Sequence, residues 1–448
     1  MDTIIKKIDI LIIGGGWAGL STAIKLVDSG KNIYLIESAK QLGGRAREVQ
    51  VKQTIVDNGT HIMIGAYTET LRLIQKVFPS SGHYSEKIQL KRENLALNYK
   101  QILKPAINLP RVPLPAPFNI IGSFLFARGL SAKDKLCVLA LGTKIKLNLI
   151  KLPSDLALQA FFEQQKQTET VIKSIWEPLC LAIMNTPLKQ ASTEIFLHVL
   201  KESFFKSRHA SDLLFFKTTL SEIFPMPAEK YITQHGGEIL LEQKAISIQQ
   251  KNDFYLITTP SLKLQTKHVV IATPPPAANK LLTELNTQQT LEPLINNLNQ
   301  FTYQAICTVY LQYPKTIQCE RNMQGFLGTT SQWMFDKKNL THQPGLVSII
   351  ISSAGPHLEM DNPSLIKTIT EELARFYPQW PEPLDAFVIR EKRATFTASV
   401  NINRIRPANR TVMDNLWLAG DYTNTQYPAT LEGAVRSGLH CAQQILAE

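Results

Sequence analysis

The chain has 448 residues, which suits two or three packed units better than a single core. Hydrophobic residues make up 44% of it and charged residues 19%, a composition typical of a folded globular protein. The formal net charge is +11, but no nucleic-acid-binding motif accompanies it, which argues against a nucleic-acid partner.

The sequence also bears on the cellular location of the protein and on whether it holds disulfides or a metal. No apolar run reaches the ~18 residues that a membrane-spanning helix needs, and residues 1–9 lack the long apolar region and cleavage site of a signal peptide. The five cysteines are scattered, odd in number and form no C-x-x-C pair. We therefore expect a reducing, cytoplasmic location, with no disulfide framework and no bound metal.

The chain begins with a predicted β-α-β unit. Residues 8–13 (IDILII) form a continuous apolar run that predicts a buried parallel strand. Residues 14–19 (GGGWAG) then fit the G-x-G-x-x-G motif and lead into a helix over about residues 20–29, which Gly30 ends. Residues 32–36 give the second strand.

This is the context in which the glycine motif binds a dinucleotide. Gly14 permits a tight turn, Gly16 lets the backbone approach a pyrophosphate, and Gly19 lets helix and strand pack closely. The pyrophosphate then meets the N-terminus of the helix and its positive dipole end. Glu37, at the end of the second strand, can accept hydrogen bonds from a ribose diol.

A segment at residues 100–152 is both basic and apolar. It holds nine basic residues against one acid, Asp134, and includes the apolar stretch 112–130. This combination favours adsorption to an anionic membrane surface, where each Lys or Arg adds roughly 1 kcal/mol. The alternative is an ordinary solvated charged face over a core segment.

The rest of the chain alternates helices and strands. A helical region is predicted over about residues 131–207, beginning with a capping box formed by Ser131 and Asp134. Further predicted elements are a helix from Pro225, a strand-like segment at 238–248 after a glycine pair, a buried strand at 269–273, a helix near 365–376, a strand at 416–419 and a helix at 431–446.

A second glycine motif favours FAD over NAD. In residues 42–46 (LGGRA), Gly43 and Gly44 give a backbone nest, and Arg45 gives a cation for phosphate. A plain NAD site does not need this step. The motif resembles the glutathione-reductase-type FAD fold of amine oxidases and carotenoid desaturases.

A third motif lies about 400 residues further on. Gly420 and Asp421 follow the predicted strand at 416–419, and the carboxylate can bind ribityl or phosphate hydroxyls. The helix that starts near Leu431 can aim its N–H groups at the flavin N1/O2 edge, where its dipole would stabilise the reduced flavin. The distance in sequence between these motifs predicts a split domain.

Residues 57–61 (DNGTH) supply two further candidates. In related flavoproteins this region passes near the isoalloxazine ring, where Gly59 permits a close approach of the backbone. His61 either faces the flavin or is a satisfied, buried histidine.

Longer blocks resemble one family. IIGGGWAGLSTA, LGGRAR, DNGTHIMIGAY, PLCLAIMNTP, IREKRATF and LAGDYTNTQYPATLEGAVRSG are similar to hydroxysqualene dehydroxylases of bacterial hopanoid and squalene synthesis. The resemblance runs from Asp9 to Ala442 and implies FAD as cofactor and a long apolar C30 isoprenoid as substrate. It implies that hydroxysqualene is reduced to squalene: a proton donor helps the hydroxyl to leave as water, and reduced FAD delivers hydride. Upstream squalene-pathway enzymes are implied as partners.

The predicted fold is α/β with two domains. A glutathione-reductase-type FAD-binding Rossmann domain, discontinuous in sequence, is expected from residues 1–95, 213–284 and 385–448. A substrate domain of mixed sheet and helices is expected from residues 96–212 and 285–384.

The site residues follow from the motifs and from the resemblance. His61, Tyr427 and His357 are candidate proton donors, and Met184 and Phe196 are candidate residues of the tunnel wall. The predicted FAD contacts are Gly14, Gly16, Trp17, Ala18, Gly19, Glu37, Gly43, Gly44, Arg45, Gly59, His61, Ala245, Ala272, Gly420, Asp421, Thr430, Leu431 and Ala434.

Three other functions stay open on the sequence. A carotene desaturase of the plant and cyanobacterial type carries a similar C-terminal block and runs hydride transfer in the opposite direction. A flavin amine oxidase usually carries Glu where Asp421 stands, which leans against that activity. A flavin-binding scaffold without chemistry is the third.

Overall fold

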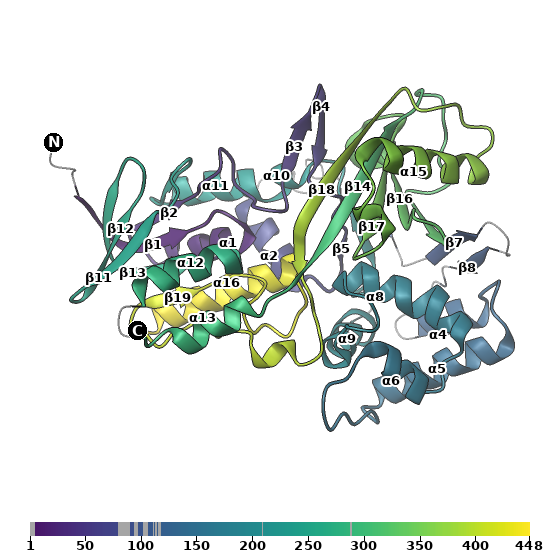
Figure 1. The fold of residues 1–448 in the computed structure, drawn as a ribbon, viewed down its shortest axis with the longest axis horizontal. Coiled ribbons are helices and arrows are strands. Elements are labelled where there is room, and N and C mark those ends of the chain that lie inside the picture. The colour runs from purple at the N-terminus through teal and green to yellow at the C-terminus, as the bar shows by residue number, and fades with distance from the viewer. Residues whose placement is uncertain are drawn as a thin grey trace.

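The predicted N-terminal β-α-β unit is present and lies at the centre of a seven-stranded sheet (Figure 1). β1 (Ile5–Ile13) pairs in parallel with β2 (Ile33–Ile36), and α1 (Trp17–Val27) connects them. The computed structural model describes residues 5–78, 90–93, 97–101, 106–110, 112, 114, 118–207, 209–286 and 289–448.

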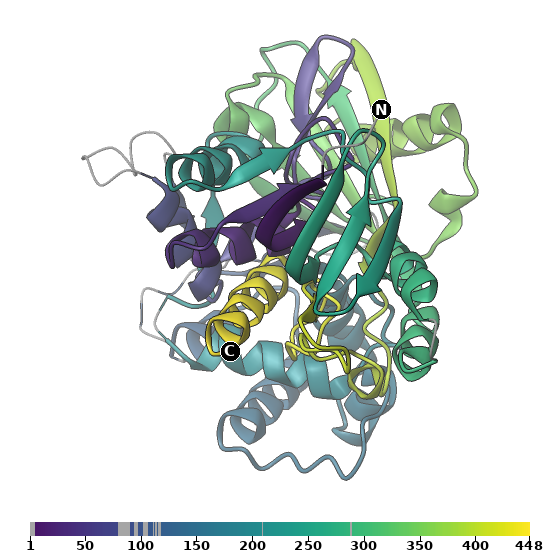
Figure 2. The same ribbon diagram turned by 90° about the vertical axis from the view of Figure 1, so that its left-hand side faces the viewer.

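Segments far apart in the chain complete this first sheet. Its order is β10-β2-β1-β13-β12-β11, and β19 pairs with β13 (Figure 2). β2 and β19 are buried along their whole length, and β1 and β13 are buried over their last residues, Ile10–Ile13 and Val269–Ile271, as these continuous apolar runs predict. The strands added are β10 (Glu238–Leu240), β11 (Ser247–Lys251), β12 (Phe254–Thr258), β13 (Lys263–Ile271) and β19 (Leu416–Leu418).

The last helix packs on the first. α16 (Leu431–Leu446) lies against α1, and the Thr22 hydroxyl donates to the Gly438 carbonyl at 3.1 Å. A Cβ added at Gly438 would lie 2.2 Å from the Ala18 carbonyl oxygen. The two helices therefore approach more closely than any side chain at position 438 permits.

The strand-like segment at 238–248 is not one strand. β10 ends at Leu240, and Glu242 adopts a left-handed conformation with φ 57°. The Glu242 and Gln243 N–H groups then donate to the carbonyls of Ala39 and Glu37, beyond the end of β2. The chain turns because it makes these bonds instead of continuing the ladder, and it resumes as β11.

A second seven-stranded sheet has the order β18-β14-β17-β16-β15-β7-β8. Its longest strands, β14 (Tyr303–Gln312) and β18 (Asp385–Phe396), are antiparallel neighbours. The predicted boundary at residue 385 assigns β18 to the FAD unit, whereas its pairing places it in this sheet. The other strands are β7 (Leu97–Gln101), β8 (Ile107–Leu109), β15 (Met323–Leu327), β16 (Trp333–Asp336) and β17 (Leu346–Ser352).

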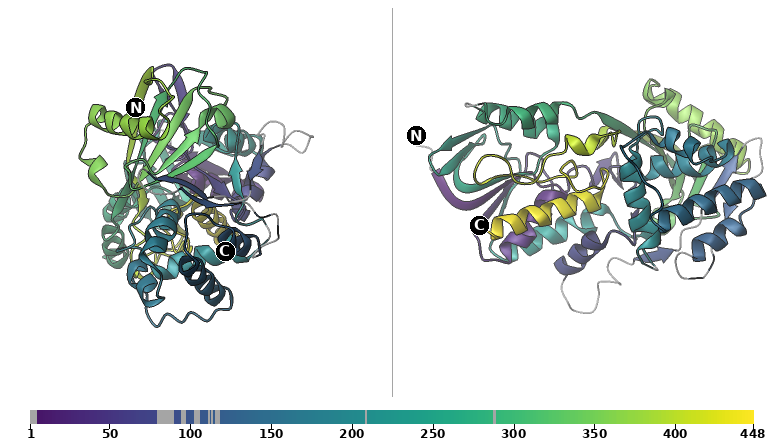
Figure 3. Two further views of the ribbon diagram at one scale, coloured as in Figure 1. Left: turned by 90° about the vertical axis from the view of Figure 1, so that its right-hand side faces the viewer. Right: turned by 90° about the horizontal axis from the view of Figure 1, so that it is seen from below.

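The predicted helical region gathers at the end of the molecule opposite the C-terminus (Figure 3). The capping box is confirmed: Ser131 accepts from the Asp134 N–H, and Asp134 accepts from the Ser131 N–H. The elements here are α4 (Phe118–Leu125), α5 (Ala132–Lys146), α6 (Leu158–Gln164), α7 (Glu169–Val171), the π-helix η1 (Ile172–Trp176), α8 (Glu177–Met184), α9 (Thr193–Leu200) and the π-helix η2 (Lys201–Phe205).

Smaller elements connect the two sheets. The hairpin β3–β4 projects from the molecule in Figure 1, and α15 lies against β18. The remaining strands and α-helices are β3 (Glu48–Val51), β4 (Thr54–Asp57), β5 (Met63–Ile64), β6 (Lys91–Glu93), β9 (Leu213–Phe215), α2 (Thr68–Val77), α10 (Leu220–Ile223), α11 (Pro225–Gln234), α12 (Pro275–Leu285), α13 (Glu292–Asn299), α14 (Lys337–Thr341) and α15 (Asn362–Phe376). Within the described ranges, no helix is both long and apolar enough to cross a bilayer.

Candidate active site

The first glycine motif has the geometry that its roles require. Gly14 has φ +113°, and a Cβ there would lie 2.7 Å from the Ala272 carbonyl oxygen. A Cβ at Gly19 would lie 2.0 Å from the Gly14 carbonyl oxygen, so this glycine serves the packing of helix on strand. A Cβ at Gly16 would meet nothing within 4 Å. Open space therefore lies in front of the loop where a pyrophosphate would approach.

Glu37 holds this loop in place. One carboxylate oxygen accepts from the Gly15 N–H at 2.7 Å, and the other accepts from the Ala39 N–H at 2.8 Å. Oε1 also accepts from the Ser38 hydroxyl at 3.1 Å, so the second lone pair of Oε2 is the one left to accept from a ribose hydroxyl.

The second glycine motif touches the first. The Gly43 N–H donates to the Gly15 carbonyl at 2.8 Å, and both Gly43 and Gly44 have positive φ. Arg45, predicted as a phosphate cation, lines the cavity and also bonds within the protein. Its guanidinium donates to the Asp421 carboxylate at 2.7 Å and to the Ala394 carbonyl at 2.8 Å. Burial lowers the pKa of Arg45, but the Asp421 carboxylate outweighs this effect and raises it.

Arg406, which the motifs do not indicate, shapes the third motif. This buried guanidinium donates to four backbone carbonyls, those of Asp421, Tyr422, Thr423 and Tyr427. Burial lowers its pKa to about 10. The side chain thus fixes the loop between β19 and α16. A single Arg carries no motif, so only the folded chain reveals this role.

A cavity of about 870 Å³ joins the three motifs. Every predicted FAD contact except Gly19 lines it, although the segments come from both ends of the chain. At the start of α16 the Thr430 hydroxyl accepts from the Gly433 N–H at 3.1 Å, so the helix begins at the cavity wall. The glycine cradle, the free front of Gly16 and the helix N-termini fit a dinucleotide cofactor.

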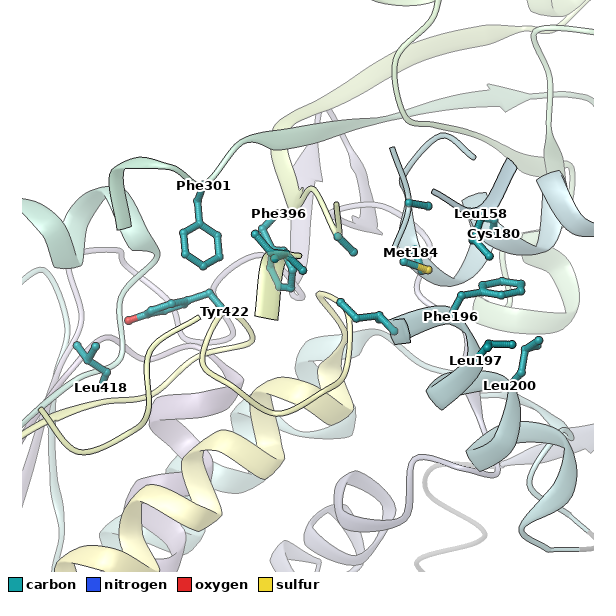
Figure 4. Close-up of a cluster of buried hydrophobic side chains, with 14 of the residues drawn as sticks. Leu158, Cys180, Met184, Phe196, Leu197, Leu200, Phe301, Phe396, Leu418 and Tyr422 are labelled. Carbon is teal, nitrogen blue, oxygen red and sulfur yellow. The ribbon is translucent and has the colours of Figure 1, made fainter. Parts of the chain in front are cut away.

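Beyond the motifs the same cavity becomes apolar, and we call this part the apolar chamber. Its residues come from the second sheet and from the helical region; they include Leu97, Tyr99, Leu179, Ile183, Val199, Phe204, Trp333, Phe335 and Ile350. Met184 and Phe196, expected in the tunnel wall, do not line it. Both are buried in the hydrophobic core between helices (Figure 4). Those predictions are wrong because other faces of the two helices turn towards the cavity, with Leu179 and Ile183 on α8 and Val199 on α9.

His61 faces the cavity. Its ring is exposed, and the surface that it exposes lies in the cavity wall, so the alternative of a fully buried histidine is wrong. Nδ1 lies 3.0 Å from the Gly59 carbonyl oxygen. Protein surrounds the cavity, and this removal from bulk water lowers the pKa of His61. The charges of Arg45 and Lys337 lower it further.

Tyr427 also lines the cavity, whereas His357 does not. The Tyr427 hydroxyl donates to the Glu202 carboxylate at 3.2 Å, and burial raises its pKa. His357 is buried beside Arg390, which donates to its carbonyl at 3.0 Å. The structure brings two of the three candidate proton donors to the cavity and leaves His357 outside its described wall.

Fold and cavity together define a flavoprotein. The chain belongs to the flavin-containing amine oxidoreductase family, whose model matches residues 17–446. It is an FAD-dependent oxidoreductase, and the predicted α/β, two-domain FAD-binding fold is confirmed.

Relatives of two kinds match almost the whole chain. The chain is 27% identical to a hydroxysqualene dehydroxylase of Zymomonas mobilis, over 97% of this chain and 98% of that protein. It is 24% identical to a 15-cis-phytoene desaturase of Glycine max, over 99% of this chain and 80% of that protein.

Solved structures show the same fold at low identity. An oxidoreductase from Methanosarcina mazei matches with a TM-score of 0.76 and 16% identity, covering 99% of this chain and 100% of that one. Cyclohexylamine oxidase from Brevibacterium oxydans matches with a TM-score of 0.69 and 16% identity, covering 98% and 99%.

Proposed function

We propose that the protein reduces hydroxysqualene to squalene. The observation that carries the proposal is the form of the cavity, which runs from the dinucleotide motifs into the apolar chamber. A C30 isoprenoid alcohol needs such a chamber for its chain and one polar position for its hydroxyl. The similarity to hydroxysqualene dehydroxylases along the whole chain supports the same reaction.

The protein's own groups would position the alcohol and supply a proton. FAD, when bound, supplies the hydride that replaces the hydroxyl. The apolar chamber orients the chain and keeps water from the allylic cation that forms when the hydroxyl leaves. His61 or Tyr427, at the cavity wall, would protonate the hydroxyl oxygen so that it leaves as water.

Anaerobic turnover tests the proposal. The purified holoprotein is reduced with dithionite and mixed with detergent-dispersed hydroxysqualene, and the flavin absorption band and the extracted product are followed. Reoxidation of the band together with squalene formation is expected. If the band stays reduced and no squalene forms, the proposal fails and a scaffold without chemistry becomes the better interpretation.

Carotene desaturation is the second candidate, and the similarity to 15-cis-phytoene desaturases over 99% of this chain favours it. It reverses the direction of hydride transfer, so the oxidised protein should bleach its flavin band when phytoene is added. Bleaching with phytoene and no reaction with hydroxysqualene would select this function. Peroxide formation with amines would select an amine oxidase.

A further inference from the structure

The helices α4 and α5 carry an unusual concentration of exposed apolar side chains. Half of the large hydrophobic residues that are exposed in the described part of the chain lie between Leu114 and Leu149. Phe126 and Leu136 expose 69% and 67% of their surface. We call this region, residues 114 and 118–151, the α4–α5 surface. A patch of this kind on a monomer marks an interaction site.

Helical spacing aligns these side chains on outer faces. In α4, the exposed residues Phe118, Ile121 and Leu125 follow i, i+3, i+7 spacing. In α5, Leu136 projects opposite the buried row that includes Val138 and Leu141, and Leu147, the residue that ends the helix, is also exposed. The core-facing side of α5 is therefore satisfied, and its outer side is left for a partner.

Cations surround the apolar side chains. Lys133, Lys144, Lys146 and Lys151 are exposed, and the Lys146 ammonium lies 6.0 Å from the Phe118 ring. The acid of this surface, Asp134, is buried and bonded by Ser131 and Thr168, so it presents no charge outward.

The α4–α5 surface lies next to the apolar chamber. The strand β8 pairs with β7, whose residues Leu97 and Tyr99 line the chamber. On its other side, Asn108 of β8 exchanges backbone hydrogen bonds with Arg128, just after α4. One strand therefore separates the chamber wall from the segment that follows α4.

We propose that the α4–α5 surface docks on the headgroup region of an anionic lipid bilayer. Exposed Phe and Leu enter the acyl boundary, while the surrounding lysines contact anionic headgroups. A protein–protein interface core is instead depleted of Lys, and a nucleic-acid surface does not need exposed Phe and Leu. The link to substrate delivery rests on the proposed function, but lipid docking itself does not.

Vesicle binding by the FAD-loaded protein tests the proposal. Vesicles of phosphatidylcholine alone and mixed with phosphatidylglycerol are sedimented with wild type, with Phe126→Ser/Leu136→Ser/Leu149→Ser and with Lys133→Gln/Lys146→Gln/Lys151→Gln. Wild type should bind the mixed vesicles, and the lysine variant should bind them about 100-fold more weakly. High salt should also weaken the binding of wild type, because it screens the attraction between the lysines and the anionic headgroups.

Matched controls replace equally exposed residues elsewhere. Ile55→Ser/Leu384→Ser/Val412→Ser and Lys230→Gln/Lys251→Gln/Lys267→Gln should bind like wild type. The proposal is overturned if the α4–α5 variants bind the mixed vesicles as tightly as wild type does. It is also overturned if wild-type binding does not depend on phosphatidylglycerol. A lipid-free dimer that the apolar variant converts to a monomer overturns it too, because the surface would then join two copies.

Turnover separates this proposal from the proposed function. The α4–α5 variants should reduce hydroxysqualene in detergent like wild type and lose activity only with substrate embedded in vesicles. If wild type is inactive in detergent, the proposed reaction is wrong, while the vesicle-binding result still decides the docking.

Discussion

Among single residues, His61 combines a cavity-facing position with a lowered pKa. If it is the proton donor, only its protonated form works. Turnover should therefore be highest at low pH and fall as the pH rises through a pKa below the usual 6.5. His61→Gln should lower the rate about 10²- to 10⁴-fold. Single-turnover flavin reoxidation across pH measures both effects.

Tyr427→Phe is the comparison variant, since it removes the hydroxyl of the other candidate proton donor at the cavity and keeps the ring. It should leave the rate and the pH profile close to those of wild type. If the rate of wild type does not change with pH, and Tyr427→Phe rather than His61→Gln loses activity, Tyr427 would be the proton donor.

Asp57 and Lys337 are both buried, and the charge of Lys337 acts on the Asp57 carboxyl. Burial raises the pKa of Asp57 to about 6, although Lys337 opposes this rise. The folded state thus holds this proton more tightly than the unfolded chain, whose Asp pKa is about 3.9. The stability that Asp57 contributes is present at low pH and is lost as the pH rises towards about 6.

Lys337→Met should raise the pKa of Asp57 further, so the loss of stability continues above about pH 6, at up to about 1.4 kcal/mol per pH unit. Urea midpoints measured between about pH 6 and pH 8 should fall in the variant and stay level in wild type. The exposed neighbour offers the control Lys338→Met, which should follow wild type. Parallel curves for Lys337→Met and wild type would show that the Lys337 charge does not act on Asp57.

At the scale of elements, the contact between α1 and α16 depends on one missing side chain. Gly438→Ala places a Cβ 2.2 Å from the Ala18 carbonyl oxygen, so the helices must separate. We expect a loss of about 1–3 kcal/mol in the free energy of unfolding and weaker FAD binding, because both helices begin at the cavity. Urea unfolding and flavin fluorescence measure these effects.

Gly142→Ala in α5 is the matched control. Nothing lies within 4 Å of its Cβ position, so this change should stabilise the protein by about 0.5–1 kcal/mol. Equal effects of the two substitutions would show that helix propensity, and not close packing, decides the outcome at position 438.

The glycine motifs could be predicted from the sequence, whereas the cavity-facing side of α8 and the role of Arg406 could not. The glycine motifs were predictable because each acts through backbone geometry within a few residues. The face of α8 that turns to the cavity was not, since packing against other helices decides it, and Met184 was misassigned for that reason. Nothing local marks Arg406, whose four carbonyl partners meet only in the folded chain.

For the whole molecule, cofactor and fold should depend on each other. The cavity wall joins segments from residue 13 to residue 434, so FAD contacts both ends of the chain when bound. Removal of FAD should lower Tm, and added FAD should restore it, by about 2.7 kcal/mol of stability at 100 times Kd. A thermal scan against FAD concentration measures this, with NAD⁺ as the control. A Tm that does not change with FAD concentration would contradict the assigned FAD site.

The packing of α16 on α1 has a consequence for biosynthesis. A ribosome makes about 5–20 residues per second, so α1 waits on the order of tens of seconds for its partner helix. The strand β19, which pairs with β13, is also among the last segments translated. The nascent chain must therefore carry an unfinished nucleotide fold until β19 and α16 have been translated, and it should need chaperone protection for most of that time.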